Sequence, residues 1–81
     1  MKYAVVIEKG VESFGAYVPD LPGCVAVGGS AEEVTALIKD AIAAHVEGLR
    51  RDGDPIPEPT SRIEYIEVYS SGGVNTEASP S

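Results

Sequence analysis

The sequence predicts an α+β domain with the element order β-β-β-α-β, in which one helix packs on a four-stranded sheet. Three observations predict this fold class. Three short apolar segments separated by turn residues open the chain, a long stretch of helical periodicity follows, and a last segment is rich in β-branched and aromatic residues. The 81 residues allow one domain and leave little room for a second core.

The first three predicted strands are short. Residues 2–9 carry apolar side chains on both alternating faces, which indicates a central strand that is covered on both sides. Residues 14–18 form the second strand, which ends at Pro19 because proline cannot donate a ladder hydrogen bond. The loop over residues 19–23 is rich in turn residues, and residues 24–28 form the third strand. The short connections favour an antiparallel meander.

The strongest local pattern predicts a helix over about residues 31–51. Ser30 can accept a hydrogen bond from the next turn, and Glu33 completes a capping box. Side chains that are apolar, except for one histidine, then recur at helical spacing and form one stripe along the helix. The stripe comprises Val34, Leu37, Ile38, Ala41, Ile42, His45 and Leu49. Gly53 is a candidate C-cap, and the prolines that follow it prevent continuation of the helix.

Residues 62–69 predict a fourth strand, since β-branched and aromatic residues dominate them. The helix before this segment is long enough for a crossover, so the third and fourth strands are expected to be parallel. From Ser70 onward the chain lacks apolar periodicity. We therefore predict one domain over residues 1–69 and a disordered polar tail over residues 70–81.

The predicted sheet has one face without cover. One helix can cover only one face of a four-stranded sheet, whereas the strands carry apolar residues on both faces. An uncovered apolar face of that size is larger than monomers usually tolerate. We therefore expect a homo-oligomer, or a partner that covers this face, although a few scattered apolar residues on a surface need no cover.

The charge balance narrows the class of partner. Thirteen acidic residues oppose six basic ones, and the formal net charge is −7. This balance disfavours direct nucleic-acid binding, which needs basic side chains facing phosphates. It favours a basic protein partner, although the charge could also serve only to keep a small protein soluble.

The same composition predicts a soluble, cytoplasmic protein. Cys24 is the only cysteine, which excludes an internal disulfide and fits a reducing compartment. The first residues lack the basic head and apolar core of a signal peptide. No apolar run approaches the roughly 20 residues that span a membrane.

Patterns for catalysis or metal binding are weak. Cys24 and His45 are the only thiol and imidazole, and Asp20 could complete a triad. A cysteine in a strand and a histidine in a helical stripe are, however, more typical of core positions. A chain with thirteen acids also offers many carboxylate sets by chance, such as Glu8, Asp20, Glu64 and Glu67. The sequence therefore predicts no enzyme, no cofactor and no metal.

Four motifs occur together along the chain and carry a resemblance. They are Y-x-V-x-I-E at residues 3–8, Y-V-P-D-L-P-G-C at 17–24, G-x-S-x-E-E at 28–33, and a helix end that runs into D-G-D-P-I-P-E-P by residue 59. This combination resembles the HicB family of antitoxins, including its short members, over nearly all of residues 3–69.

The resemblance implies a partial ribonuclease-H-like fold, which agrees with the predicted element order. It also implies an antitoxin that binds and neutralises HicA, a small basic toxin that cleaves messenger RNA. Many HicB proteins add a C-terminal DNA-binding domain, whereas only a dozen polar residues follow Tyr69 here, so operator binding by this chain alone is not expected. The alternative is a stand-alone small-ligand-binding or regulatory domain of the same fold.

Two segments are candidate contacts with such a partner. The first is a loop whose prolines limit the entropy lost on binding and which joins an acid to an apolar side chain that we expect to be exposed. It comprises Asp20, Leu21, Pro22 and Gly23. A purely structural turn into the third strand explains this loop equally well. The second candidate is the last predicted strand, in which Glu64 and Glu67 supply acidic side chains.

Overall fold

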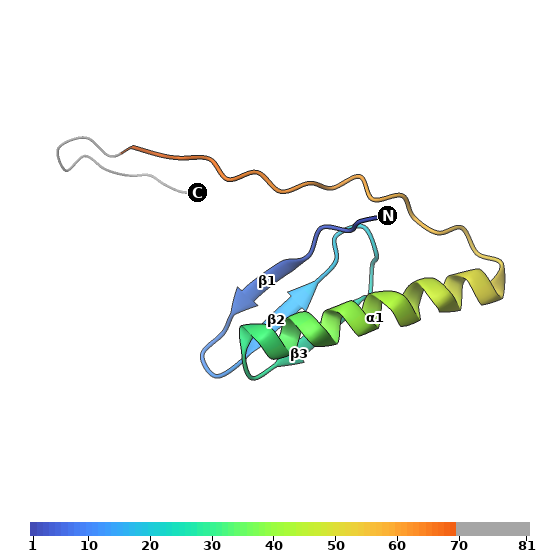
Figure 1. Ribbon diagram of the computed structural model, residues 1–81, viewed down its shortest axis with the longest axis horizontal. Helices are drawn as coiled ribbons and strands as arrows, with labels where there is room; N and C mark the ends of the chain where they lie inside the picture. Colours follow the sequence, from blue (N-terminus) through green and yellow to red (C-terminus); the bar gives the residue numbers. More distant parts are fainter. Residues whose placement is uncertain (70–81) are drawn as a thin grey trace.

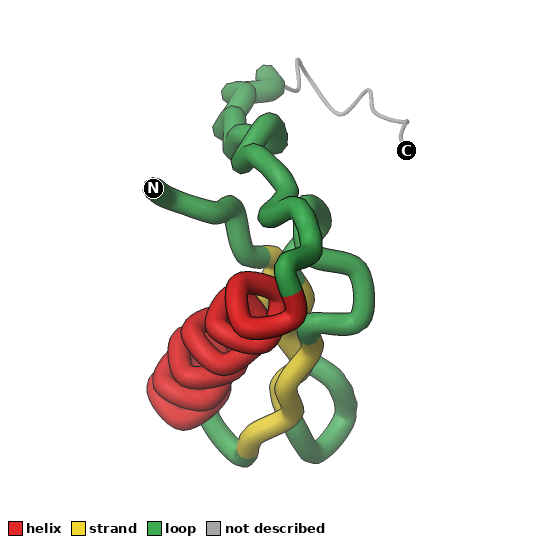
Figure 2. Tube along the Cα trace, turned by 90° about the vertical axis from the view of Figure 1, so that its right-hand side faces the viewer, coloured by secondary structure: helices red, strands yellow, loops and turns green. Residues whose placement is uncertain are grey.

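The computed structural model describes residues 1–69, which contain a three-stranded sheet and one helix. The strands are β1 (Val6–Lys9), β2 (Phe14–Tyr17) and β3 (Val25–Gly28), and the helix is α1 (Ala31–Asp52). The strands are antiparallel neighbours in the order β1-β2-β3. Helix α1 lies across one face of this sheet, chiefly over β3 and β2 (Figures 1 and 2). The predicted meander and the helix that follows it are therefore confirmed. The predicted tail over residues 70–81 lies outside the described residues.

The prediction of a fourth sheet strand is wrong for the described part of the chain. Residues 62–69 carry no strand assignment, and all of them are exposed. Figure 1 shows the chain turning back after α1, passing the N-terminus and leaving the domain as an extended segment. We call residues 62–69 the arm. Its side chains are suited to a strand, but the sheet of residues 1–69 contains no ladder with it, and the predicted parallel pairing with β3 is not formed.

The core lies between α1 and the sheet. Its six buried side chains come from β2, from the loop after it and from α1, and they are Ala16, Val18, Leu21, Cys24, Val34 and Ile38. The predicted helical stripe points to this core through Val34 and Ile38, while Leu37 is exposed at the margin of the stripe. Burial of one such Val, Leu or Ile side chain stabilises the fold by about 1.5–3 kcal/mol.

Both ends of α1 are capped by the residues that predicted its limits. The Ser30 hydroxyl accepts a hydrogen bond from the Glu33 amide at 3.0 Å, and the Glu33 carboxylate accepts one from the Gly29 amide at 2.7 Å. At the other end Gly53 has a φ of 75° and donates its amide hydrogen to the Arg50 carbonyl, while the Asp54 amide donates to the Leu49 carbonyl. This pattern is a Schellman motif.

The end of β3 approaches α1 closely. A Cβ atom on Gly28 would lie 3.0 Å from the backbone nitrogen of Val34 and 3.2 Å from its Cα atom. Any larger residue at position 28 would push the first turn of α1 away from the sheet. The absence of a side chain at Gly28 therefore sets the distance between the helix and the sheet.

Candidate functional site

The loop between β2 and β3, residues 18–24, consists of two successive turns. The Leu21 amide donates to the Val18 carbonyl at 3.0 Å, and the Cys24 amide donates to the Leu21 carbonyl at 3.0 Å. In the second turn Pro22 precedes Gly23, which has a φ of 86°. Proline at the first central position and a left-handed glycine at the second define a type II turn. The backbone of this loop is therefore ordered by its own hydrogen bonds.

Leu21 is fully buried, with 0% of its surface exposed. The expectation that this apolar side chain projects to solvent beside Asp20 is therefore wrong. The first turn of the loop directs Leu21 into the core, where it lies in one cluster with Val18 and Cys24. Pro22 and Gly23 are the exposed residues of the predicted contact loop.

Asp20 holds the chain segment that leads into the arm. Its Oδ2 atom accepts hydrogen bonds from the amides of Thr60 and Ser61 at 3.1 and 2.9 Å. Its Oδ1 atom accepts hydrogen bonds from the hydroxyls of the same two residues at 3.1 and 3.0 Å. These bonds, led by the one from the Ser61 amide, lower the pKa of the Asp20 carboxyl. Ionised Asp20 thus acts as an internal anchor, and we call this set of bonds the Asp20 anchor.

A second contact holds the same segment against the N-terminal residues. The Tyr3 hydroxyl donates to the Pro57 carbonyl at 2.6 Å. This bond places Pro57 beside the residues that precede β1, while the Asp20 anchor places Thr60 and Ser61 beside the loop between β2 and β3. Sequence reasoning missed Thr60 and Ser61 because their partner lies 40 and 41 residues away, and no local pattern marks such a pair.

The arm begins directly after the anchored residues. Glu64 pairs with Arg62 at 3.2 Å, and the Tyr69 hydroxyl donates to Glu67 at 3.1 Å. Both glutamates are exposed, as a contact with a partner requires. The structure therefore joins the loop, through Asp20, to the two residues just before the arm.

The face of the sheet opposite α1 is uncovered in the described part of the chain. Val6, Tyr17 and Val25 are direct cross-strand neighbours on this side, and Val27 lies in the next row opposite Gly15. The side chains of Val25 and Val27 are 62% and 67% exposed. We call Val6, Tyr17, Val25 and Val27 the open face. Three of these side chains are exposed, Tyr17, Val25 and Val27, so the open face is a candidate surface for a protein contact.

Two of the three residues considered for catalysis already have structural roles. Asp20 is occupied by Thr60 and Ser61, and Cys24 lies in the core, where burial raises the pKa of its thiol. A raised pKa disfavours the thiolate, which is the nucleophilic form. Within residues 1–69, no three His, Cys, Asp or Glu side chains converge as a metal site would require.

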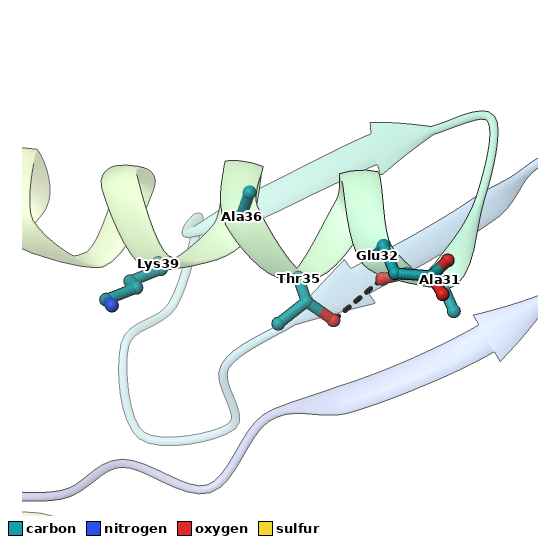
Figure 3. A pocket seen from close by; sticks show the side chains of 5 residues that line it. All are labelled: Ala31, Glu32, Thr35, Ala36 and Lys39. Atoms are coloured by element: carbon teal, nitrogen blue, oxygen red, sulfur yellow. Dashed lines mark hydrogen bonds between the residues drawn. The ribbon is translucent and has the colours of Figure 1, made fainter.

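A shallow hollow lies on the solvent side of α1 (Figure 3). The same helix supplies all of its lining residues, Ala31, Glu32, Thr35, Ala36 and Lys39. The Thr35 hydroxyl donates to the Ala31 carbonyl at 2.7 Å, so this polar group is already satisfied within the helix. One helix surface without a facing element does not enclose a small molecule, and small-molecule sites are usually concave and enclosed.

In the part of the chain that the structure describes, α1 is not apolar enough over its length to cross a membrane.

Comparison with known proteins agrees with this arrangement. Residues 3–72 match the profile of a family described as the HicB-like antitoxin of bacterial toxin–antitoxin systems. A UPF0150 protein of Thermoplasma acidophilum is 40% identical over 71 residues, which cover 86% of this chain and 100% of that protein. An uncharacterised 14.9 kDa protein of Haemophilus phage HP1 is 35% identical over 66 residues, which cover 82% of this chain. The match spans only 50% of the phage protein.

A solved structure also matches the fold. A chain of a HicA3 and HicB3 toxin–antitoxin complex superposes with a TM-score of 0.64 at 35% sequence identity. The superposition covers 74% of this chain and 70% of that one.

Proposed function

Since this chain belongs to the HicB-like antitoxin family of bacterial toxin–antitoxin systems, we propose that it binds and neutralises a small basic toxin of the HicA type in the cytoplasm. It acts by occupying the toxin surface rather than by catalysis. The observation that carries the proposal is the likeness, at 35% identity, to a chain from a HicA3 and HicB3 complex. The partial ribonuclease-H-like fold stays a proposal that rests on the family resemblance, because residues 1–69 form a sheet of only three strands.

Charge supplies the long-range attraction in this proposal. The formal net charge of −7 creates a negative field that speeds the encounter with a basic protein and weakens as salt is added. The same charge disfavours direct nucleic-acid binding by this chain. Steering of this kind raises the association rate more than it raises the affinity.

Apolar contact then holds the complex. The open face offers Tyr17, Val25 and Val27, which are exposed and lie side by side on β2 and β3. Burial of such side chains in an interface excludes water, and aromatic residues frequently act as the anchors of interfaces. We assign the open face to the centre of the toxin contact.

The predicted contact residues divide into two roles. Pro22, Gly23, Glu64 and Glu67 are exposed and are assigned to the rim of the contact. Asp20 and Leu21 act through them, because Leu21 packs the loop on the core and Asp20 holds the root of the arm. A polar rim around an apolar centre is the usual anatomy of a protein interface.

Co-expression tests the proposal. A HicA-type toxin encoded beside this chain should arrest growth when expressed alone, and this chain should restore growth and purify together with the toxin. Continued growth arrest in the presence of well-expressed, folded protein, with no co-purification, would contradict the proposal.

Charge reversal on the arm tests the assigned rim. Glu67→Lys should weaken toxin binding measurably at low salt, and the deficit should shrink as salt screens the charges. Glu12→Lys is the matched control, because Glu12 is exposed in the turn between β1 and β2 and the substitution changes the net charge equally. Equal losses for both variants would assign the effect to net charge rather than to the arm.

A further inference from the structure

The arm exposes far more apolar surface than a solvated segment needs. Ile66, Val68 and Tyr69 are 79%, 84% and 83% exposed, and Tyr65 is 93% exposed. Ile63 is exposed as well. Residues of these types favour strands because they pack on a half-buried pleated surface. The arm therefore has the composition of a sheet strand without the sheet that such a strand needs.

A vacant strand position exists in the same molecule. Strand β1 pairs with β2 on one side, and within residues 1–69 its other edge has no neighbouring strand. An unpaired edge presents a row of free amides and carbonyls, which is a template for an incoming strand. The side chains of residues 1–9 include two basic groups and one acidic group, Lys2, Lys9 and Glu8, whereas those of the arm include two acidic groups and one basic group, Glu64, Glu67 and Arg62. The β1 edge and the arm therefore carry small net charges of opposite sign.

The connection before the arm is stiff and tied down. Pro55, Pro57 and Pro59 keep it extended, since proline-rich segments behave as semi-rigid spacers. The Asp20 anchor then holds Thr60 and Ser61, and the Tyr3–Pro57 bond holds the chain just before them. Figures 1 and 2 show the arm directed away from the sheet and helix of its own chain. This geometry presents the arm to another molecule.

We propose that two copies of this chain exchange arms, so that residues 62–69 of each copy pair along the free edge of β1 in the other copy. Each copy supplies one strand and one vacant edge. A two-fold symmetric dimer therefore satisfies both arms and both edges with a single type of contact, as isologous interfaces do. Each three-stranded sheet gains its fourth strand from the partner.

A second copy fits the arm better than another occupant does, because this chain carries both halves of the contact. The pairing uses the backbone of the arm, so side chains that point to either face of the completed sheet remain available to a toxin. The dimer is independent of the proposed antitoxin function and is measured without any toxin present.

The mass of the full-length protein is the first test. Multi-angle light scattering at micromolar concentration should give twice the monomer mass. Ile66→Pro, which removes a backbone donor in the arm, and Ile66→Asp should each raise the dimer dissociation constant by at least about tenfold. Val11→Asp is the control, because Val11 is 99% exposed in the β1–β2 turn, and this variant should remain dimeric. A monomeric wild-type protein, or an Ile66→Pro variant that dimerises normally, would overturn the proposal.

Cross-linking distinguishes exchange between copies from pairing within one copy. Isotope-labelled and unlabelled wild-type chains are unfolded together in denaturant and refolded as a mixture, so that mixed dimers can form. A zero-length carboxyl-to-amine reagent then joins Glu64 or Glu67 to Lys2 or Lys9. Peptides that join a labelled arm to an unlabelled β1 region support the exchange. Links confined to a single isotope would show that the arm pairs with its own sheet and would refute the exchange.

Addition of the toxin separates a failure of the exchange proposal from a failure of the proposed function. If this protein is monomeric and the arm resists proteolysis only after a HicA-type toxin is added, the arm is a toxin-binding strand, and the exchange proposal fails while the proposed function stands. If the dimer forms as described and no toxin is neutralised, the proposed function fails while the exchange stands.

Discussion

The loop over residues 18–24 and the arm both join acidic residues to apolar neighbours, yet they differ completely in burial. Leu21 of the loop is 0% exposed, whereas Tyr65 of the arm is 93% exposed. The loop makes three backbone hydrogen bonds of its own between Val18 and Cys24. In the arm, the hydrogen bond and the ion pair join side chains of nearby residues and leave the backbone available.

This difference shows that an acidic residue next to an apolar one does not by itself decide whether the apolar side chain packs inward or stays exposed. The loop closes a short hairpin connection, so its apolar residue has the core within reach. The arm follows a proline-rich spacer, and the Asp20 anchor directs it outward. One residue of the loop thereby determines where the arm begins.

The largest expected effect separates the buried loop residue from an exposed one. Leu21→Ala should lower the free energy of unfolding by about 2–5 kcal/mol, because it removes a fully buried side chain and leaves a cavity. Val11→Ala, at a 99% exposed position, should change it by less than about 0.5 kcal/mol. Urea denaturation of both variants measures the two changes in the free energy of unfolding. If the change for Leu21→Ala were as small as that for Val11→Ala, Leu21 would not be part of the core.

The type II turn of the loop gives the next effect. Gly23→Ala should destabilise the protein by about 1 kcal/mol, since an L side chain is strained at the positive φ of this residue. Gly48→Ala is an instructive control with the opposite sign, because Gly48 lies inside α1 and alanine there should stabilise by about 0.5–1 kcal/mol. Thermal unfolding of the two variants compares them directly. Stabilisation by Gly23→Ala would show that the turn does not require this conformation.

The third prediction breaks the link between the two regions. Asp20→Ala removes the acceptor of all four bonds from Thr60 and Ser61, so the amides of these residues should exchange with solvent faster while those of α1 remain protected. Hydrogen exchange followed by mass spectrometry measures this. Asp40→Ala removes a carboxylate that is exposed on α1, and it should leave the exchange of residues 60 and 61 unchanged. Unaltered exchange in Asp20→Ala would mean that other contacts hold the arm root.

Acid should release the same link. The pKa of Asp20 is lowered in the folded protein, chiefly by the Ser61 amide, so its contribution to stability is complete above the unfolded pKa of about 3.9 and is lost as the pH falls through the folded value. The amide resonance of Ser61 should therefore shift below about pH 4. Asp20→Asn should abolish this titration, and a Ser61 resonance that titrates equally in the variant would identify a different carboxyl group.

The smallest expected effect is on the arm side of the comparison. Glu67→Lys should change the free energy of unfolding by less than about 0.5 kcal/mol, because Glu67 is exposed and its hydrogen-bond partner is the nearby Tyr69 hydroxyl. Chemical denaturation at one fixed protein concentration measures it. A loss well above this limit would show that Glu67 contributes to the fold itself.

Local chemistry explains the part of the fold that was predictable. The limits of α1 follow from Ser30, Glu33 and Gly53, whose hydrogen bonds join residues only a few positions apart. The three short strands follow from alternation and turn residues, and the uncovered sheet face follows from apolar residues on both sides of these strands. The two segments chosen as contacts stay predictions, and the structure shows that Leu21 and Asp20 have structural roles within the chain.

What the sequence by itself determined is therefore the set of elements, their order and their ends, because each depends on interactions between near neighbours. The tertiary structure alone decided that Leu21 belongs to the core, that Asp20 holds Thr60 and Ser61 across some 40 residues, and that residues 62–69 leave the sheet. Strand propensity indicates that a segment can form a strand, but the segment must also reach a free edge of the sheet. Whether the arm reaches such an edge depends on the direction of the chain after the proline-rich spacer and the Asp20 anchor.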